Sequence, residues 1–169
     1  MKKMLKNKKG FSLVELVIVI AIMGVLAAVA ISMFTGMIQR SRRQADNTRA
    51  QQIQKAIVTY MAEVGDMNLS QMNGGAGEPK VDEILVWLQK QNEVTFTDGS
   101  KDYVGPYLEN IRGEASAKNY DPQQSGMNGW KITINKTTGE VQVEPDKNDS
   151  TDYDGDSTTG GGESTTGGE

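Results

Sequence analysis

Cysteine and histidine are both missing from this 169-residue chain. Without them the protein has no thiol nucleophile, no imidazole base, no disulfide and none of the usual zinc ligand sets. The chain also lacks a glycine-rich loop of the kind that holds phosphate groups. Catalysis would have to rest on carboxylate, lysine, serine or tyrosine side chains alone. We therefore predict that the protein is not an enzyme and has no metal ion or cofactor.

The charged side chains are unevenly distributed. The first ten residues contain five lysines and no acid, and without them the chain has 13 basic against 22 acidic side chains. Residues 144–169 contain eight acids and a single lysine. This acidic balance argues against nucleic acid as a partner. The length suits one modest domain with extensions.

Sixteen consecutive apolar positions, from Leu16 to Ile31, follow the basic segment. With the apolar residues on either side, the run is about as long as the roughly 20 residues that a bilayer-spanning helix needs. The lysines before it would hold that end of the chain in the cytosol. The sequence therefore predicts a precursor that crosses the cytoplasmic membrane once, with its N-terminus inside.

Two simple explanations of this segment leave one residue unexplained. The segment fits a secretory signal peptide cut after Ala28-Val29-Ala30, and it also fits a permanent single-span anchor. Neither benefits from Glu15, a carboxylate near the start of the apolar run, where a charge costs up to about 3 kcal/mol in a membrane. An ionisable residue in such a place indicates a functional site with a partner.

A cut between Gly10 and Phe11 would supply that partner. It creates an α-amino group on Phe11, and Glu15 lies four residues further on, about one helical turn away. A buried amine and a buried carboxylate are each unfavourable alone, but they neutralise one another when paired. The pair can form within one chain, and between neighbouring chains it would also set the axial stagger of a polymer.

The same residues carry a family resemblance. The stretch Lys9-Gly10-Phe11-Ser12-Leu13-Val14-Glu15-Leu16 closely resembles the cleavage and methylation motif of type IV pilins. The resemblance implies that a membrane aspartyl peptidase, the prepilin peptidase, cleaves after Gly10 and N-methylates Phe11. It also implies that Glu15 is the glutamate required for assembly. One departure is Ser32, which stands where many pilins have a proline.

Beyond the apolar run, no strong helix breaker occurs before Gly65, so residues 11–64 are expected to form one helix about 80 Å long. We divide it into a transmembrane and filament-core half, residues 11–36, and an amphipathic half, residues 37–65. The first half has no core of its own, and we expect it to protrude and to be covered by other copies. Apolar residues at three- and four-residue spacing form one face of the second half: Ala50, Ile53, Ala56, Ile57, Tyr60, Met61 and Val64.

Residues 66–145 are predicted to form a headgroup that packs on this face. A second helix is expected from Val81 to Lys90, where the pair Asp82-Glu83 suits a helix N-terminus better than a catalytic role. Two alternating runs, 130–135 and 141–144, predict a hairpin with one buried face. A long helix packed on a small antiparallel sheet is the α+β arrangement of the type IV pilin fold.

The basic run Arg40-Ser41-Arg42-Arg43 comes directly after the apolar half of the helix. It fits a collar of long side chains that face lipid headgroups. The alternative is pairing with acidic surfaces of other subunits, and weak contact with DNA would be a third use.

Both ends of the chain are expected to lie outside the headgroup. Residues 1–10 are the leader peptide. Residues 146–169 are rich in Gly, Ser, Thr and acids, which predicts a disordered tail. The segment Asp152-Tyr153-Asp154-Gly155 is similar to part of a calcium loop, but Gly161 stands where the bidentate acid should be. A solvated tail is the better explanation.

Together these features predict a structural subunit, a major pilin, that forms a helical homopolymer on the cell surface. The resemblance implies roles in adhesion, biofilm formation or twitching motility. It implies as partners the prepilin peptidase, a platform membrane protein and separate assembly and retraction ATPases. The lack of cysteine and the acidic tail make the chain most similar to clostridial, Gram-positive pilins. The main alternative is a pseudopilin of a type II secretion or competence system. A membrane-tethered binding module, uncleaved or cut after Ala30, is the alternative of another class.

Overall fold

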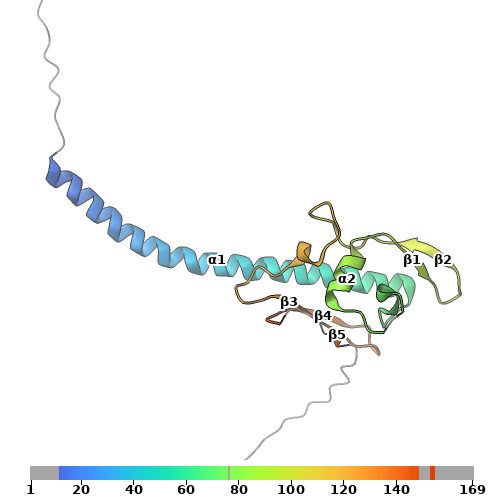
Figure 1. Ribbon diagram of the computed structural model, residues 1–169. Coiled ribbons are helices and arrows are strands. Elements are labelled where there is room, and N and C mark those ends of the chain that lie inside the picture. The colour runs from blue at the N-terminus through green and yellow to red at the C-terminus, as the bar shows by residue number, and fades with distance from the viewer. Residues whose placement is uncertain (1–11, 76, 149–152, 155–169) are drawn as a thin grey trace, which may run out of the picture. The chain divides into compact units, whose positions relative to one another are not determined.

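The computed structural model describes residues 12–75, 77–148 and 153–154 (Figure 1). A long helix, α1 (Leu13–Val64), is followed by a 3₁₀ turn, η1 (Ser70–Asn73), and a short helix, α2 (Val81–Leu88). The remaining elements in chain order are β1 (Asn92–Thr95), β2 (Lys101–Val104), η2 (Ala117–Tyr120), β3 (Gly129–Ile134), β4 (Val141–Asp146) and β5 (Tyr153–Asp154). A long N-terminal helix with small, mainly antiparallel sheets confirms the predicted α+β class.

The chain divides into two compact units, residues 1–41 and 42–169, and α1 contributes to both. In the first unit none of the described residues is buried. The helix continues through Ser32 because serine, unlike proline, keeps its backbone N–H. The Ser32 hydroxyl donates to the carbonyl oxygen of Ala28 at 3.3 Å. The departure from the pilin pattern at this position therefore leaves an unbroken helix.

The second unit has one hydrophobic core, to which α1 contributes a face. All seven apolar residues predicted for that face are buried, and Asp46 is buried with them. The same core cluster includes apolar side chains of α2, such as Ile84 and Leu85, and of the β3–β4 hairpin, such as Trp130 and Ile132. The amphipathic half of α1 thus supplies one wall of the core, and α2 and the hairpin supply others.

Strands β3 and β4 pair antiparallel, with Ile132 opposite Val143 and Ile134 opposite Val141. Along β4, buried Val141 and Val143 alternate with exposed Gln142 and Glu144, which confirms the predicted one-sided hairpin. A separate two-stranded antiparallel sheet consists of β1 and β2. The β3–β4 hairpin therefore places its alternating residues as the sequence pattern predicts.

The third strand of the larger sheet comes from the range predicted as a tail. Strand β5 pairs parallel with β3, so that the strand order is β4-β3-β5. A two-residue strand has no periodic pattern, and sequence reasoning did not anticipate it. Residues 149–152 and 155–169 of the predicted tail lie outside the described residues.

Helix α2 ends at Leu88, two residues before the predicted end, and Gln89 follows as its C-terminal cap. The Gln89 side-chain amide donates to the carbonyl oxygens of Leu85 and Ser116, and its carbonyl accepts from Asn119. Asn119 and Tyr120, in the polar connection between β2 and β3, are buried as well. The polar segment before β3 is therefore fastened to the core by buried amides.

Candidate functional site

Of the three residues predicted to form the processing and assembly site, the structure describes one. Glu15 lies in the first turn of α1, whereas Gly10 and Phe11 lie outside the described residues. The geometry around Glu15 can therefore be described on its helical side, from Ser12 onward.

The Glu15 carboxylate belongs to a helix-capping arrangement. Its Oε2 atom accepts a hydrogen bond from the backbone N–H of Ser12 at 3.0 Å. In return, the Ser12 hydroxyl accepts from the N–H of Val14 at 3.3 Å, and the Ser12 carbonyl from Leu16 at 3.2 Å. A Ser followed three residues later by Glu is the sequence pattern of a capping box. Sequence reasoning missed this role, although Ser12-Leu13-Val14-Glu15 shows the pattern.

This cap holds a negative charge at the N-terminal end of α1, where the helix dipole favours it. The Ser12 nitrogen that Glu15 contacts belongs to the peptide bond that follows Phe11. By covalent connectivity, the amino nitrogen of Phe11 is three bonds from that contacted nitrogen.

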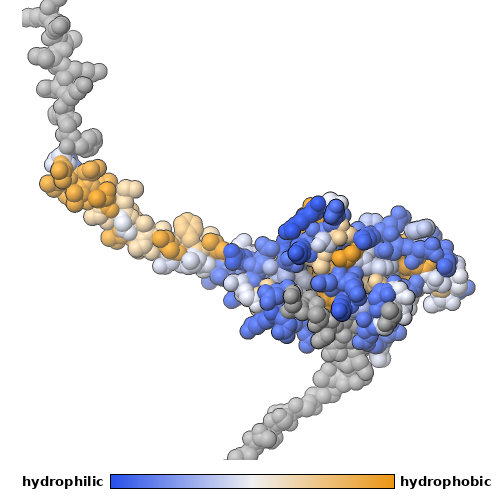
Figure 2. All heavy atoms as spheres, in the orientation of Figure 1, coloured by the Kyte–Doolittle hydropathy of each residue, from blue (hydrophilic) through white to orange (hydrophobic). Residues whose placement is uncertain are grey.

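The first unit has an apolar surface on all sides. Seventeen of the 21 exposed large apolar side chains among the described residues lie between Leu13 and Ile38. Figure 2 shows this stretch as hydrophobic, whereas hydrophilic residues dominate the visible surface of the second unit. Among the described residues, α1 is the one helix long and apolar enough to cross a membrane, and none of that apolar stretch is buried. Monomeric soluble proteins rarely expose so large an apolar surface, which favours its being covered by lipid or by other copies.

A second group of functional interest lies on α1 in the second unit. The carboxylate of Asp46 accepts from the backbone N–H of Gln123 at 2.6 Å and of Gln124 at 3.0 Å. One turn further, the Arg49 guanidinium donates to the carbonyl of Asp121. Sequence reasoning missed both residues. Asp46 could have been noticed, because it lies one turn before Ala50, where the apolar face of α1 begins. These contacts fasten the segment before β3 to α1.

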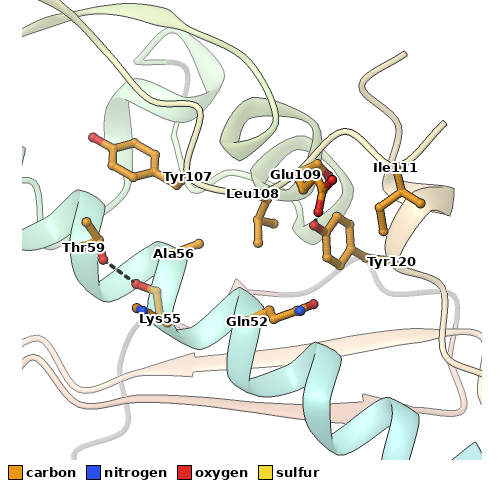
Figure 3. Close-up of a pocket in the computed structure, with 9 residues that line it drawn as sticks. All are labelled: Gln52, Lys55, Ala56, Thr59, Tyr107, Leu108, Glu109, Ile111 and Tyr120. Carbon is orange, nitrogen blue, oxygen red and sulfur yellow. Dashed lines mark hydrogen bonds between the residues drawn. The ribbon is translucent and has the colours of Figure 1, made fainter. Parts of the chain in front are cut away.

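A cavity of about 300 Å³ lies between α1 and residues 107–120 (Figure 3). Gln52, Lys55 and Thr59 line it from α1, opposite Tyr107 and Tyr120. All three of the hydroxyl groups that line it form hydrogen bonds within the chain. Thr59 donates to the Lys55 carbonyl at 2.8 Å, Tyr120 to the Glu109 carbonyl at 3.0 Å, and Tyr107 to the Glu63 carboxylate at 2.7 Å.

The electrostatics of this cavity do not favour proton transfer. Burial, and next the hydrogen bond to Glu63, raise the pKa of the Tyr107 hydroxyl above its ordinary value. Burial also raises the pKa of Tyr120. Both phenols therefore stay protonated near neutral pH and act as hydrogen-bond donors. Of the three hydroxyl groups that line the cavity, the Tyr107 hydroxyl contacts a carboxylate, and its raised pKa keeps it as the donor in that hydrogen bond.

Comparison with known proteins identifies the N-terminal segment. Residues 5–31 match the family model of the prokaryotic N-terminal methylation motif. This match includes Gly10, Phe11 and Glu15, and it supports a type IV pilin-like protein, either a pilin or a pseudopilin subunit. Such proteins are structural subunits that the prepilin peptidase processes and that assemble into pilus-like polymers. No solved structure matches the chain.

Proposed function

We propose that the protein is a type IV pilin. It is cleaved after Gly10, N-methylated at Phe11 and polymerised through residues 11–36 into a surface filament. One observation carries this proposal: within the matched motif, Glu15 caps the part of α1, residues 13–38, whose surface is apolar and unburied. Capping would also serve the helix of a signal peptide or a plain anchor, so the match to the motif is what favours a pilin over both.

Cleavage changes the chemistry around Glu15 in a defined way. In the precursor, the nitrogen of Phe11 is a neutral amide, and in the mature chain it becomes an ammonium group. A carboxylate that enters an apolar filament core needs an opposite charge, since an unpaired charge there is strongly unfavourable. We propose that Glu15 of one copy pairs with the amine of a neighbouring copy, so that only processed chains assemble.

Assembly must also replace the lipid around the first unit. In the bilayer the apolar side chains of residues 13–38 are already shielded, so leaving it gives no net hydrophobic gain unless other copies take the place of lipid. Close packing of the apolar helices supplies that replacement, and separate ATPases acting through a platform membrane protein supply the work of extraction. The precursor is therefore a single-span membrane protein with its N-terminus in the cytosol.

At a finer level, we propose a major subunit of an extracellular filament that serves adhesion, biofilm formation or twitching motility. The lack of cysteine and the acidic Gly/Ser/Thr-rich end support a Gram-positive, clostridial-type pilin. The alternative, a pseudopilin of a secretion or competence system, shares the same motif and differs in the length and location of its polymer.

The proposal is tested on surface material sheared from cells that produce the chain. We expect electron microscopy to show filaments and mass spectrometry to find a subunit that begins with methylated Phe11. A mature chain that begins at Ile31, or an uncleaved surface protein, would contradict it. Absence of surface filaments together with a secretion or DNA-uptake defect would favour the pseudopilin.

The cleavage site is tested by replacing Gly10 with leucine. We expect only the uncleaved, membrane-bound precursor, because the peptidase needs close access to the backbone at that glycine. Ala30→Leu is the matched control, since it alters the signal-peptidase-like site and should leave processing unchanged. Mature protein of normal length from the Gly10 variant would rule out the proposed site.

A further inference from the structure

The buried face of α1 begins at Asp46, and in the turn before it the described part of the chain leaves two arginines exposed. Arg42 and Arg43 are both exposed. At 100° per residue they lie within roughly 60° of Asp46 around the helix axis, so they continue the buried face towards the N-terminus. Within the described part of the chain, neither has a hydrogen-bond or ion-pair partner.

A groove of about 400 Å³ on the second unit has the complementary chemistry. Met72, Val86 and Trp87 give it an apolar floor, and Asp82 and Glu83 stand on its rim. The other lining residues are Lys90 and Asn92, so the acids outnumber the single cation. The Trp87 ring is held in place by Tyr60, with ring centroids 4.9 Å apart, and it stacks on Tyr107 at 6.4 Å.

This combination suits an arginine side chain better than a lipid or an acidic segment. The aliphatic stem of an arginine packs on apolar surface while its guanidinium stays near polar groups. A guanidinium binds carboxylates through several donors and is attracted to the face of a tryptophan ring. The two acids on the rim would repel an anionic partner.

We propose that this groove receives Arg42 or Arg43 from α1 of a second copy. The inference rests on the proposed filament, which brings many copies of the same helix together. Charge complementarity supports the assignment. Arg42 and Arg43 have no partner among the described residues, and the groove, which carries Asp82 and Glu83, lies further along α1 beside Tyr60. The exposed Arg42 and Arg43 of one copy are then covered by the second unit of a neighbour.

The contact predicts how far one copy is displaced from the other along the axis of α1. Trp87 lies at the level of Tyr60, and Tyr60 follows Arg42 by 18 residues, which is about 27 Å along an α-helix. Pairing of Glu15 with a neighbouring Phe11 amine instead corresponds to a shift of four residues, or about 6 Å. The groove therefore joins a different pair of neighbours from the one that the N-terminal ion pair joins.

Disulfide cross-linking tests the contact directly, because the natural chain has no cysteine. Full-length chains carrying Asp82→Cys with either Arg42→Cys or Arg43→Cys are produced in cells, and their sheared filaments are oxidised. We expect at least one pair to give a ladder of linked subunits on non-reducing gels. Asp82→Cys with Arg112→Cys is the matched control, since Arg112 is equally exposed and lies on a loop. Filaments without a ladder from either pair would refute the contact but not the proposed function.

A charge exchange covers the case in which the cysteine variants do not assemble. We expect Arg42→Glu with Arg43→Glu to lower the filament yield at least tenfold, and Arg112→Glu to leave it unchanged. Adding Asp82→Arg to the double variant should restore most of the yield. Failure to restore it, at normal subunit levels, would also refute the contact. Absence of filaments from the unsubstituted chain would instead refute the proposed function itself.

Discussion

The two parts of helix α1 differ in what can cover them. Residues 13–41 have no buried residue and are apolar around the circumference as far as Ile38, whereas residues 42–64 are apolar on one face that is buried in the second unit. Both parts have the same backbone structure. The difference lies in side-chain distribution, because a one-sided stripe is satisfied by one core and an all-round surface needs lipid or several neighbours. Folding of the second part is thus intramolecular, and the proposed covering of the first part is intermolecular.

The largest effect is expected from Glu15, the acid in the apolar part of α1. Glu15→Gln should retain the capping box, since glutamine also serves at that position, but it removes the charge. Glu15→Val removes both. We expect both variants to be cleaved normally and to form no detectable filaments by electron microscopy, and Glu144→Gln to assemble normally. Normal filaments from Glu15→Gln would show that Glu15 acts as a helix cap and not as an ion-pair partner.

A matched pair of isoleucines tests the two parts against each other. Ile57 is 0% exposed and Ile20 is 59% exposed. Ile57→Ala should lower the free energy of unfolding by about 2–5 kcal/mol, because it removes packed atoms and leaves a cavity. Ile20→Ala should change it by less than about 0.5 kcal/mol. Urea unfolding of the mature chain in detergent, followed by tryptophan fluorescence, measures both, and equal effects would contradict the division of α1.

Asp46 marks the point on α1 at which burial begins, and its removal should have a smaller effect. Asp46→Ala leaves the N–H groups of Gln123 and Gln124 without their acceptor, which should cost about 1–3 kcal/mol. Asp46→Asn keeps one acceptor oxygen and should cost less. Hydrogen exchange of the two amides gives the local readout. Unchanged protection in Asp46→Ala would mean that the contact does not hold the segment.

The smallest effect on stability is expected at Asp98, a fully exposed residue of the second unit whose carboxylate is surrounded mainly by solvent. Hydrogen bonds from the hydroxyl and then the N–H of Ser100 lower the pKa of Asp98. The carboxylate form is favoured in the folded state. The contribution of these hydrogen bonds to the stability of the fold is therefore fully present above the ordinary pKa of aspartate. It is lost as the pH falls through the lowered pKa of Asp98.

Ser100→Ala should move the pKa of Asp98 back up towards its ordinary value, with little effect on unfolding. NMR titration of the side-chain carboxyl carbon measures the shift. A pKa of Asp98 that does not change in the variant would contradict the assigned cause.

Regular patterns made much of the fold predictable. The stripe from Ala50 to Val64 and the alternation in β3 and β4 follow from the helical and strand repeats, so their buried faces could be named in advance. Gln89, Asn119 and Tyr120 could not be placed, because their partners lie far apart in sequence. Glu15 was found from its charge in an apolar run, but its hydrogen bond to Ser12 was not considered.

The sequence by itself determined the N-terminal motif, the unbroken apolar run with its single acid, and the periodic faces of α1 and the main hairpin. Those properties are local, since each depends on the type and spacing of neighbouring residues. Only the tertiary structure decided that Asp46 is buried against residues 123–124, that β5 pairs with β3, and that Trp87 forms the floor of an acid-rimmed groove. Each of these depends on backbone and side-chain groups brought together by the core, which no local pattern records.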